Sequence, residues 1–232
     1  MKKFFTLIAA VAMAASMNAQ GTYAVQEGDN VKAGDQITSV ENITLTYMEN
    51  DGTAYAAVKK QTNWADADFG AYVCGKSNGK LVSGAEPTGC VYKFETTKAG
   101  SLTVAVQLNA NKGFHILDAE FAEVAPASYN LPAAKDGDSQ EFTQNEKGEN
   151  IIEEKSNGTV TFNVAEGGTY YVLATGTKMG FFGFKYEADT STGISSIEAA
   201  AKNDGKTYNM AGQQVSSSFK GLVIKNGKKF VK

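Results

Sequence analysis

The single tryptophan of the chain stands in a polar segment whose side chains suit a sugar. Trp64 follows Asn63 and precedes Asp66 and Asp68. An indole stacks on the apolar face of a sugar ring, while amides and carboxylates bind its hydroxyls. These four residues therefore predict a carbohydrate site on a loop between two strands. The alternative is that Trp64 closes one end of the hydrophobic core.

Two pairs of carboxylates are spaced like fragments of a calcium loop. Asp66 and Asp68 form one pair, and Asp136 and Asp138 form the other. Ca²⁺ prefers several oxygen ligands, but neither pair continues into the full loop with a distal glutamate. Ca²⁺ is thus the one cofactor that these residues suggest, and solvated turns are the simpler interpretation.

The only two cysteines flank a loop rich in glycine and serine. Cys74 and Cys90 each lie at the end of an apolar run that contains a tyrosine, Tyr72-Val-Cys74 and Cys90-Val-Tyr92. In an exported protein an even cysteine count favours a disulfide, so a Cys74–Cys90 bridge is expected. Two buried free thiols acting as small apolar residues are the alternative.

The sequence assigns no catalytic residue. His115 is the only histidine, and its apolar neighbours indicate a structural role on a strand. The sequence contains no nucleophile elbow, H-E-x-x-H helix or phosphate-binding glycine loop. Paired carboxylates that cleave glycosides leave no local signature, so a small polysaccharide hydrolase or lyase using acidic residues remains the enzymatic alternative.

The charge composition argues against a nucleic-acid partner. All 22 basic residues among the 232 are lysines, and they face 25 acidic residues, for a net charge of -3. Without arginine the chain lacks the usual bidentate clamp for phosphate or guanine. Any binding site must be built from lysines, carboxylates, amides and aromatic rings, which suit sugars better than phosphates.

The N-terminus predicts export. Two lysines precede an apolar run of about a dozen residues and then small residues, as in a secretory signal peptide. Cleavage is expected between Ala19 and Gln20, so that 1–19 is removed. The run is too short to span roughly 30 Å of hydrocarbon, so no transmembrane segment is expected.

The elements that must position these side chains are strands. Short alternating apolar runs fall between Asp-Gly, Asn-Gly and Gly-Gly turns, which is typical of antiparallel sheets. Sheets with one apolar face must stack, so residues 20–188 predict an all-β sandwich or jelly roll. Residues 189–192 read as a linker, and 193–232 as a small β-hairpin tail. Short helical turns within 117–155 are the main alternative to strands.

The tail resembles a known family. It contains Tyr208-Asn-Met-Ala-Gly-Gln-Gln-Val215 and then Lys220-Gly-Leu-Val-Ile-Lys-Asn-Gly-Lys-Lys-Phe-Val-Lys232. Both stretches resemble the C-terminal sorting domain of type IX secretion cargo in Gram-negative bacteria. The resemblance implies a secretion-machinery partner and a place at the outer cell surface. The matching positions include Asn209, Gly212, Gln213, Val215, Gly221, Gly227, Lys228 and Lys229.

The region 158–184 is similar to the last strands of carbohydrate-binding jelly rolls from secreted bacterial proteins. The expected function is therefore a secreted or surface-exposed, non-catalytic module that binds a glycan or a surface partner protein. Besides the hydrolase or lyase, a structural subunit of a surface fibre or matrix is an alternative, because sheet edges can self-associate.

Overall fold

The computed structural model describes residues 20–49, 55–60, 68–133, 137–189, 207–209, 214–216, 219–225 and 228–231. Every helix or strand assigned in these ranges is a β-strand. The chain divides into two compact units, Met1–Thr190 and Ser191–Lys232. Across the described ranges there is no helix that is long and apolar enough to cross a membrane.

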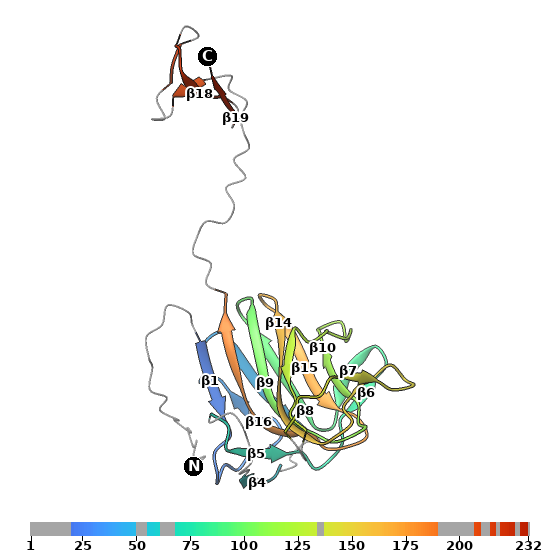
Figure 1. Cartoon of the computed structure of the whole chain (residues 1–232). Coiled ribbons are helices and arrows are strands. Elements are labelled where there is room, and N and C mark those ends of the chain that lie inside the picture. Colours follow the sequence, from blue (N-terminus) through green and yellow to red (C-terminus); the bar gives the residue numbers. More distant parts are fainter. Residues whose placement is uncertain are drawn as a thin grey trace, which may run out of the picture. The chain divides into compact units, whose positions relative to one another are not determined.

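Seven strands form the first sheet of the larger unit. They are β1 (Gln20–Ala24), β4 (Ala56–Lys60), β5 (Ala71–Cys74), β9 (Gly100–Leu108), β11 (Ser128–Asn130), β14 (Ser156–Val164) and β16 (Gly180–Ala188). Their order is β11–β14–β9–β16–β5–β4, and β1 also pairs with β16. Figure 1 shows β1, β16, β9 and β14 running side by side.

Seven further strands form the second sheet. They are β2 (Gln36–Ile37), β3 (Ile43–Met48), β8 (Val91–Thr96), β10 (Phe114–Leu117), β12 (Thr143–Gln144), β13 (Asn150–Ile151) and β15 (Thr169–Ala174). Their order is β12–β13–β10–β15–β8–β3–β2. All pairings in both sheets are antiparallel, for example β15 with β8. The expected antiparallel β-sandwich is confirmed.

Alternating sequence explains why these segments are strands with one buried face. In β3, Ile43, Leu45 and Tyr47 are buried, and the residues between them are partly exposed. In β14, Val160 and Phe162 are buried in the same way. A period of two places all the apolar side chains of a strand on one face, and each sheet turns that face towards the other.

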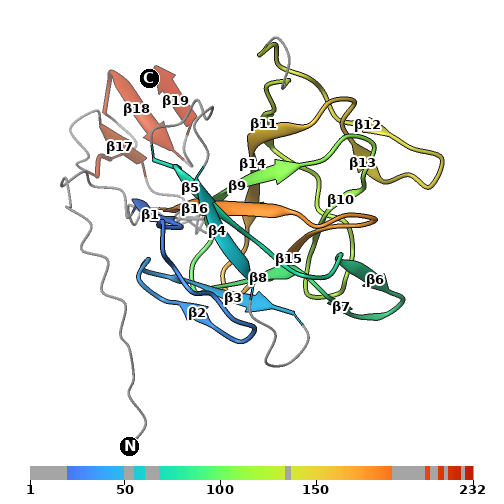
Figure 2. The ribbon, with the colours of Figure 1, turned by 90° about the horizontal axis from the view of Figure 1, so that it is seen from below.

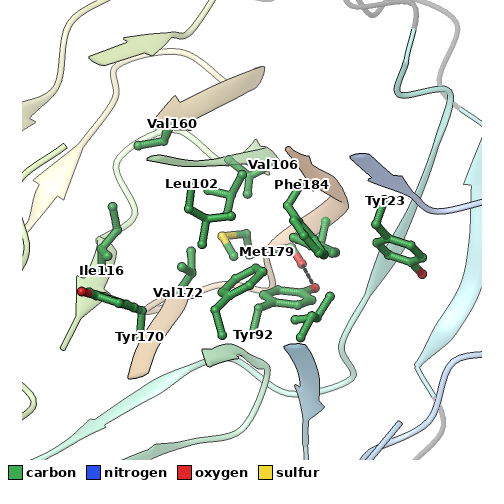
Figure 3. Packing of buried hydrophobic residues seen from close by; sticks show 14 of the residues in the cluster. Tyr23, Tyr92, Leu102, Val106, Ile116, Val160, Tyr170, Val172, Met179 and Phe184 are labelled. Atoms are coloured by element: carbon green, nitrogen blue, oxygen red, sulfur yellow. Dashed lines mark hydrogen bonds between the residues drawn. The ribbon is translucent and has the colours of Figure 1, made fainter. Parts of the chain in front are cut away.

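Aromatic side chains fill much of the space between the sheets. Tyr92 stacks on Phe181 with ring centroids 4.4 Å apart, and Phe94 meets Phe184 edge to face at 5.4 Å. The Tyr92 hydroxyl donates to the Met179 carbonyl over 3.2 Å, drawn as a dashed line in Figure 3. The buried phenol is therefore satisfied inside an apolar core.

One glycine lets β1 approach β16. Gly183 has φ 142 and lies where the β16 register shifts after Phe181. A Cβ at this position would collide with the Tyr23 carbonyl oxygen of β1. Only glycine combines this backbone conformation with such a close approach. The position therefore fixes how the N-terminal strand joins the sheet.

A separate hairpin lies between the two cysteines. It consists of β6 (Lys80–Val82) and β7 (Ala85–Thr88), and Figures 1 and 2 show it projecting from the sandwich. Leu81 and Val82 are exposed on it.

The predicted disulfide is wrong, because Cys74 and Cys90 are not bonded to each other. Cys74 is in β5 of the first sheet, whereas Cys90 directly precedes β8 of the second. The Cys90 thiol donates to the Tyr92 hydroxyl over 3.5 Å and packs against the Gly75 backbone. Cys90 thus behaves as the buried apolar thiol of the alternative interpretation.

In 117–133 and 137–155, the parts of this region that the structure describes, the helical turns considered do not form. Residues 118–127 form an irregular loop, and β11, β12 and β13 follow as short strands. Asp118 stabilises the start of this loop, because its side chain accepts hydrogen bonds from the backbone N–H groups of Glu120 and Ala122. Such local bonds compete with helix formation.

The described residues of the smaller unit form a three-stranded antiparallel sheet. Its order is β17 (Thr207–Asn209), β18 (Leu222–Lys225) and β19 (Lys228–Val231). Val223 is buried, whereas Leu222 and Val231 are exposed. A hairpin-type tail is therefore present, with a small core, as expected for a unit of this size.

Candidate functional site

The outward side of the first sheet carries polar side chains on neighbouring strands, beside a small apolar cluster of Phe69, Ala105 and Phe182. Core residues such as Val104 and Val106 alternate with residues that face away from the second sheet. We call this surface the polar face. It comprises Tyr72, Ser101, Thr103, Gln107, Asn157, Thr159, Thr161, Asn163 and Lys185.

Two amides form a pair on the polar face. Gln107 and Asn157 are directly opposite each other in β9 and β14. The Gln107 Nε2 group donates to Asn157 Oδ1 over 2.9 Å. A carboxamide has two donor hydrogens and an acceptor oxygen. Gln107 is buried, at 9% exposed, whereas Asn157 is half-buried, so Gln107 positions Asn157, whose amino group is the one offered to a ligand.

An aromatic ring lies next to this amide pair. Tyr72 is half-buried, and its ring packs against Phe182 with centroids 5.2 Å apart. Gly180 leaves the space for the ring, because a Cβ there would stand 2.9 Å from both the Tyr72 ring and Gln107 Cβ. A tyrosine, a glutamine and an asparagine from three strands thus form one row.

Hydroxyl and charged groups continue the polar face along the strands. Thr103 and Thr161 share a hydrogen bond of 2.8 Å between their Oγ1 atoms. Thr103 also pairs in register with Lys185, whose Nζ lies 2.8 Å from an Asp68 carboxylate oxygen. Lys185 lies over the Phe69 ring at 5.3 Å. The lysine charge is therefore already paired.

The predicted sugar-binding segment is only partly within the described residues. Asn63, Trp64 and Asp66 lie outside them. Asp68 lies within them, and its ion pair with Lys185 places it at the polar face. The structure thus brings one member of the predicted set to the same surface as Tyr72.

Of the four aspartates considered as calcium ligands, two lie within the described residues and two lie outside them. Asp66 and Asp136 are outside the described residues, whereas Asp68 and Asp138 are within them. Among the residues that the structure describes, no group of three or more histidine, cysteine, aspartate or glutamate side chains is placed to hold a metal ion.

A second polar cluster surrounds His115 on the outward side of the second sheet. His115 Nδ1 lies 2.5 Å from Glu123 Oε1, and Nε2 lies 3.3 Å from Thr175 Oγ1. Hydroxyl, imidazole and carboxylate follow the order of a catalytic triad. However, the Thr175 hydroxyl donates to Glu149 Oε1 over 2.9 Å, and a carboxylate there would repel the oxyanion formed by nucleophilic attack. We therefore assign this cluster no catalysis.

The tail positions singled out from the sequence are divided between described and undescribed residues. Asn209 ends β17, Val215 follows the isolated bridge of Tyr208 with Gln214, and Gly221 directly precedes β18. Lys228 and Lys229 begin β19. Gly212, Gln213 and Gly227 lie outside the described residues.

Sequence reasoning missed the row formed by Tyr72, Gln107 and Asn157. The three residues are separated by 35 and 50 positions in the chain, and their strands become neighbours only through the strand order of the sheet. One signal was available in the sequence: Gln107 and Asn157 alternate with the apolar residues of their own strands, which places both on the face opposite the core.

Comparison with known proteins gives no assignment for this chain: no family model matches it, and neither does any curated protein.

Proposed function

We propose that the larger unit is a non-catalytic module that binds a neutral carbohydrate chain on the polar face. The observation that carries this proposal is the row of Tyr72, Gln107 and Asn157. In such sites an aromatic ring usually stacks on the sugar, and neighbouring amides form hydrogen bonds to its hydroxyls. The ring packs against the protein on one side, which limits the entropy lost on binding.

Charge favours a neutral ligand over an acidic one. Residues 20–189 contain 13 lysines and 23 acidic residues, a net charge of -10. A field of this sign repels polyanions such as uronate or sulfated chains. Lys185, a lysine of the polar face, is paired with Asp68, so its charge is already engaged by a carboxylate.

We also propose that the chain is exported and then sorted by its tail. The basic and apolar pattern of residues 1–19 supports export. Of the residues that match the sorting motif, Lys228 and Lys229 begin β19, and Gly221 directly precedes β18, in the separate smaller unit. In a bacterium with type IX secretion, deletion of 193–232 should abolish surface display of the protein. Undiminished display without the tail would exclude sorting.

The binding proposal is tested by incubating the full-length chain with soluble neutral glucans and mannans, and with polygalacturonate as an acidic control. We expect retention on at least one neutral polymer, no retention on polygalacturonate and no new reducing ends. New reducing ends would instead indicate the hydrolase. Preferential binding to polygalacturonate would contradict the charge argument, and retention on none of the neutral polymers would contradict the carbohydrate proposal.

A further inference from the structure

The outward side of β14 carries a row of uncharged polar side chains. Asn157, Thr159, Thr161 and Asn163 alternate with the buried residues of the strand, so all four face away from the core. The first three are half-buried, and Asn163 is exposed. Asn163 lies six positions after Asn157, and a strand rises about 3.4 Å per residue, so the row is roughly 20 Å long. We call these four residues the β14 strip.

Hydroxyl and amide groups of the neighbouring strands widen the β14 strip. Thr161 lies directly opposite Thr103 of β9 on one side and Ser128 of β11 on the other, and Figure 2 shows the three strands side by side. On β11, Asn130 lies opposite Thr159 in the same way. The Thr103 and Thr161 hydroxyls share one hydrogen bond, which leaves one hydrogen and further lone pairs of the pair for a ligand.

Strand stability does not explain all the residue types of the β14 strip. Threonine is common in strands, but asparagine is depleted from them. Asn157 and Asn163 nevertheless lie within β14, and Asn130 ends β11 beside them. An asparagine side chain offers two donor hydrogens and an acceptor oxygen. These groups match the hydroxyls of a sugar chain, so binding supplies a reason for asparagine that strand formation does not.

The outward side of the second sheet differs in charge. There Lys93 and Glu95 occupy the outward positions of β8 and form an ion pair of 3.6 Å. Charged side chains are costly to dehydrate, whereas neutral amides and hydroxyls exchange bonds to water for bonds to a ligand at little cost. The uncharged β14 strip is therefore the better surface for a neutral chain.

We propose that the ligand of the polar face is an extended neutral polysaccharide that lies lengthwise along the β14 strip, an inference that rests on the proposed carbohydrate function. One sugar stacks on Tyr72, beside the Gln107–Asn157 pair at one end of the strip. The following sugars contact Thr159, Thr161 and then Asn163. The strip is several times longer than one sugar ring, so each added sugar makes new hydrogen bonds until the strip is filled. Affinity therefore depends on chain length.

Titration of the full-length chain with α- and β-linked glucose and mannose oligosaccharides, from the disaccharide to the octasaccharide, tests this placement of the ligand. In the series that binds, we expect affinity to rise roughly tenfold or more from the disaccharide to the longest oligosaccharide. Equal affinity at all lengths would overturn binding along the strip and leave a sugar site at Tyr72 intact. Binding of no oligosaccharide at any length would contradict the carbohydrate proposal itself, and the strip with it.

Two matched variants locate the ligand on the sheet. Thr161→Val keeps the shape of the side chain and removes its hydroxyl. It should bind the longest oligosaccharide roughly threefold to tenfold more weakly than the wild type, and its unchanged affinity for the disaccharide should show that the fold is intact. Thr44→Val makes the same exchange at a half-buried outward position of the second sheet and should behave as the wild type. Equal effects of the two variants, or an equal loss for short and long oligosaccharides in Thr161→Val, would overturn the proposal.

Discussion

At the residue scale, the polar face depends on side chains that are individually ordinary. Gln107 is buried and Asn157 is half-buried, and they become a binding element because their strands place them opposite each other. Truncation of one partner removes donors from a ligand and also leaves the other amide without its hydrogen bond. Both effects weaken binding without disturbing the apolar core on the other side of the sheet.

We therefore expect Gln107→Ala to weaken binding of a neutral polysaccharide by roughly fivefold to thirtyfold, from hydrogen bonds contributing about 1–2 kcal/mol. Affinity electrophoresis in gels containing the polymer measures this change. The matched control is Gln36→Ala, which removes an exposed amide of the second sheet that bonds to Thr46 Oγ1. Equal losses in the two variants would contradict the assignment of the polar face.

Glu149 gives a prediction about acid stability. The Asn145 hydrogen bond is the main cause of its lowered pKa, and Thr175 and His115 add to it. A carboxyl whose pKa is lowered by folding stabilises the fold above its ordinary value of 4.5, and this stabilisation is lost as pH falls below it. Glu149→Gln should thus be destabilised near pH 7, and should lose less additional stability than the wild type between about pH 5 and 3.

Urea unfolding at several pH values measures this, with Glu146→Gln as the control on the same loop. Glu146 is exposed, so its variant should follow the wild-type pH profile. If Glu149→Gln shows the wild-type profile as well, the hydrogen bonds to Glu149 do not stabilise the fold.

At the element scale, the strands were predictable but their neighbours were not. The alternation of apolar and polar residues predicted β3, β9, β14, β15 and β16, since the signal is local and the buried face enforces it. Strand order depends on contacts between distant segments. The sequence therefore gave no sign that β14, β9 and β16 lie together, and so the row formed by Tyr72, Gln107 and Asn157 could not be found.

Short strands and special contacts were also beyond the sequence. β11, β12 and β13 have two or three residues each, which is too few for a periodic pattern. The disulfide prediction failed for a related reason: cysteine count and spacing say nothing about which groups surround a thiol. In the fold the Cys90 thiol bonds to Tyr92. The pattern did predict correctly that the fold is an antiparallel β-sandwich.

The junction of β1 and β16 gives a prediction at this scale. Gly183→Ala introduces a Cβ that collides with the Tyr23 carbonyl oxygen, at a φ of 142 that alanine rarely adopts. We expect a loss of about 2 kcal/mol or more in the free energy of unfolding, and faster hydrogen exchange in β1. Gly70→Ala is the control, because a Cβ there meets nothing within 4 Å. Equal stability of both variants would show that the close approach of β1 is not required.

At the scale of the whole molecule, the buried hydroxyl and thiol groups set an alkaline limit. Burial raises the pKa of Cys90 to about 11 and that of Tyr23 to about 12. Burial also raises the pKa values of Tyr47 and Tyr92. These groups must stay neutral in the fold but ionise freely once unfolded. Their contribution to the free energy of unfolding is complete below about pH 9 and is lost as pH rises towards 11 or 12.

The free energy of unfolding should therefore fall by about 2 kcal/mol or more between pH 8 and pH 10.5. Guanidinium unfolding at both pH values measures the change. In Cys90→Ala the decrease in the free energy of unfolding between the two pH values should be smaller, because the thiol that ionises first is then absent. A free energy of unfolding that is unchanged at pH 10.5 would show that these groups are solvated in the native protein.

The two units differ in charge, which bears on how the whole molecule meets a ligand. Residues 20–189 carry -10, whereas residues 191–232 contain seven lysines and two acidic residues, a net charge of +5. If the tail is removed after export, the displayed module is more acidic than the intact chain. Its selectivity for neutral over anionic polymers should then increase, most clearly at low ionic strength.

The most direct test of the carbohydrate-binding face is the affinity of the full-length Tyr72→Ala variant for the neutral polysaccharide that the wild type retains. Loss of the stacking ring should weaken binding roughly tenfold or more, with an unchanged far-ultraviolet spectrum. Tyr72→Phe, which keeps the ring, should bind nearly as well as the wild type, and so should Tyr208→Ala in the smaller unit. Wild-type affinity in Tyr72→Ala would contradict the proposal that the polar face holds the sugar.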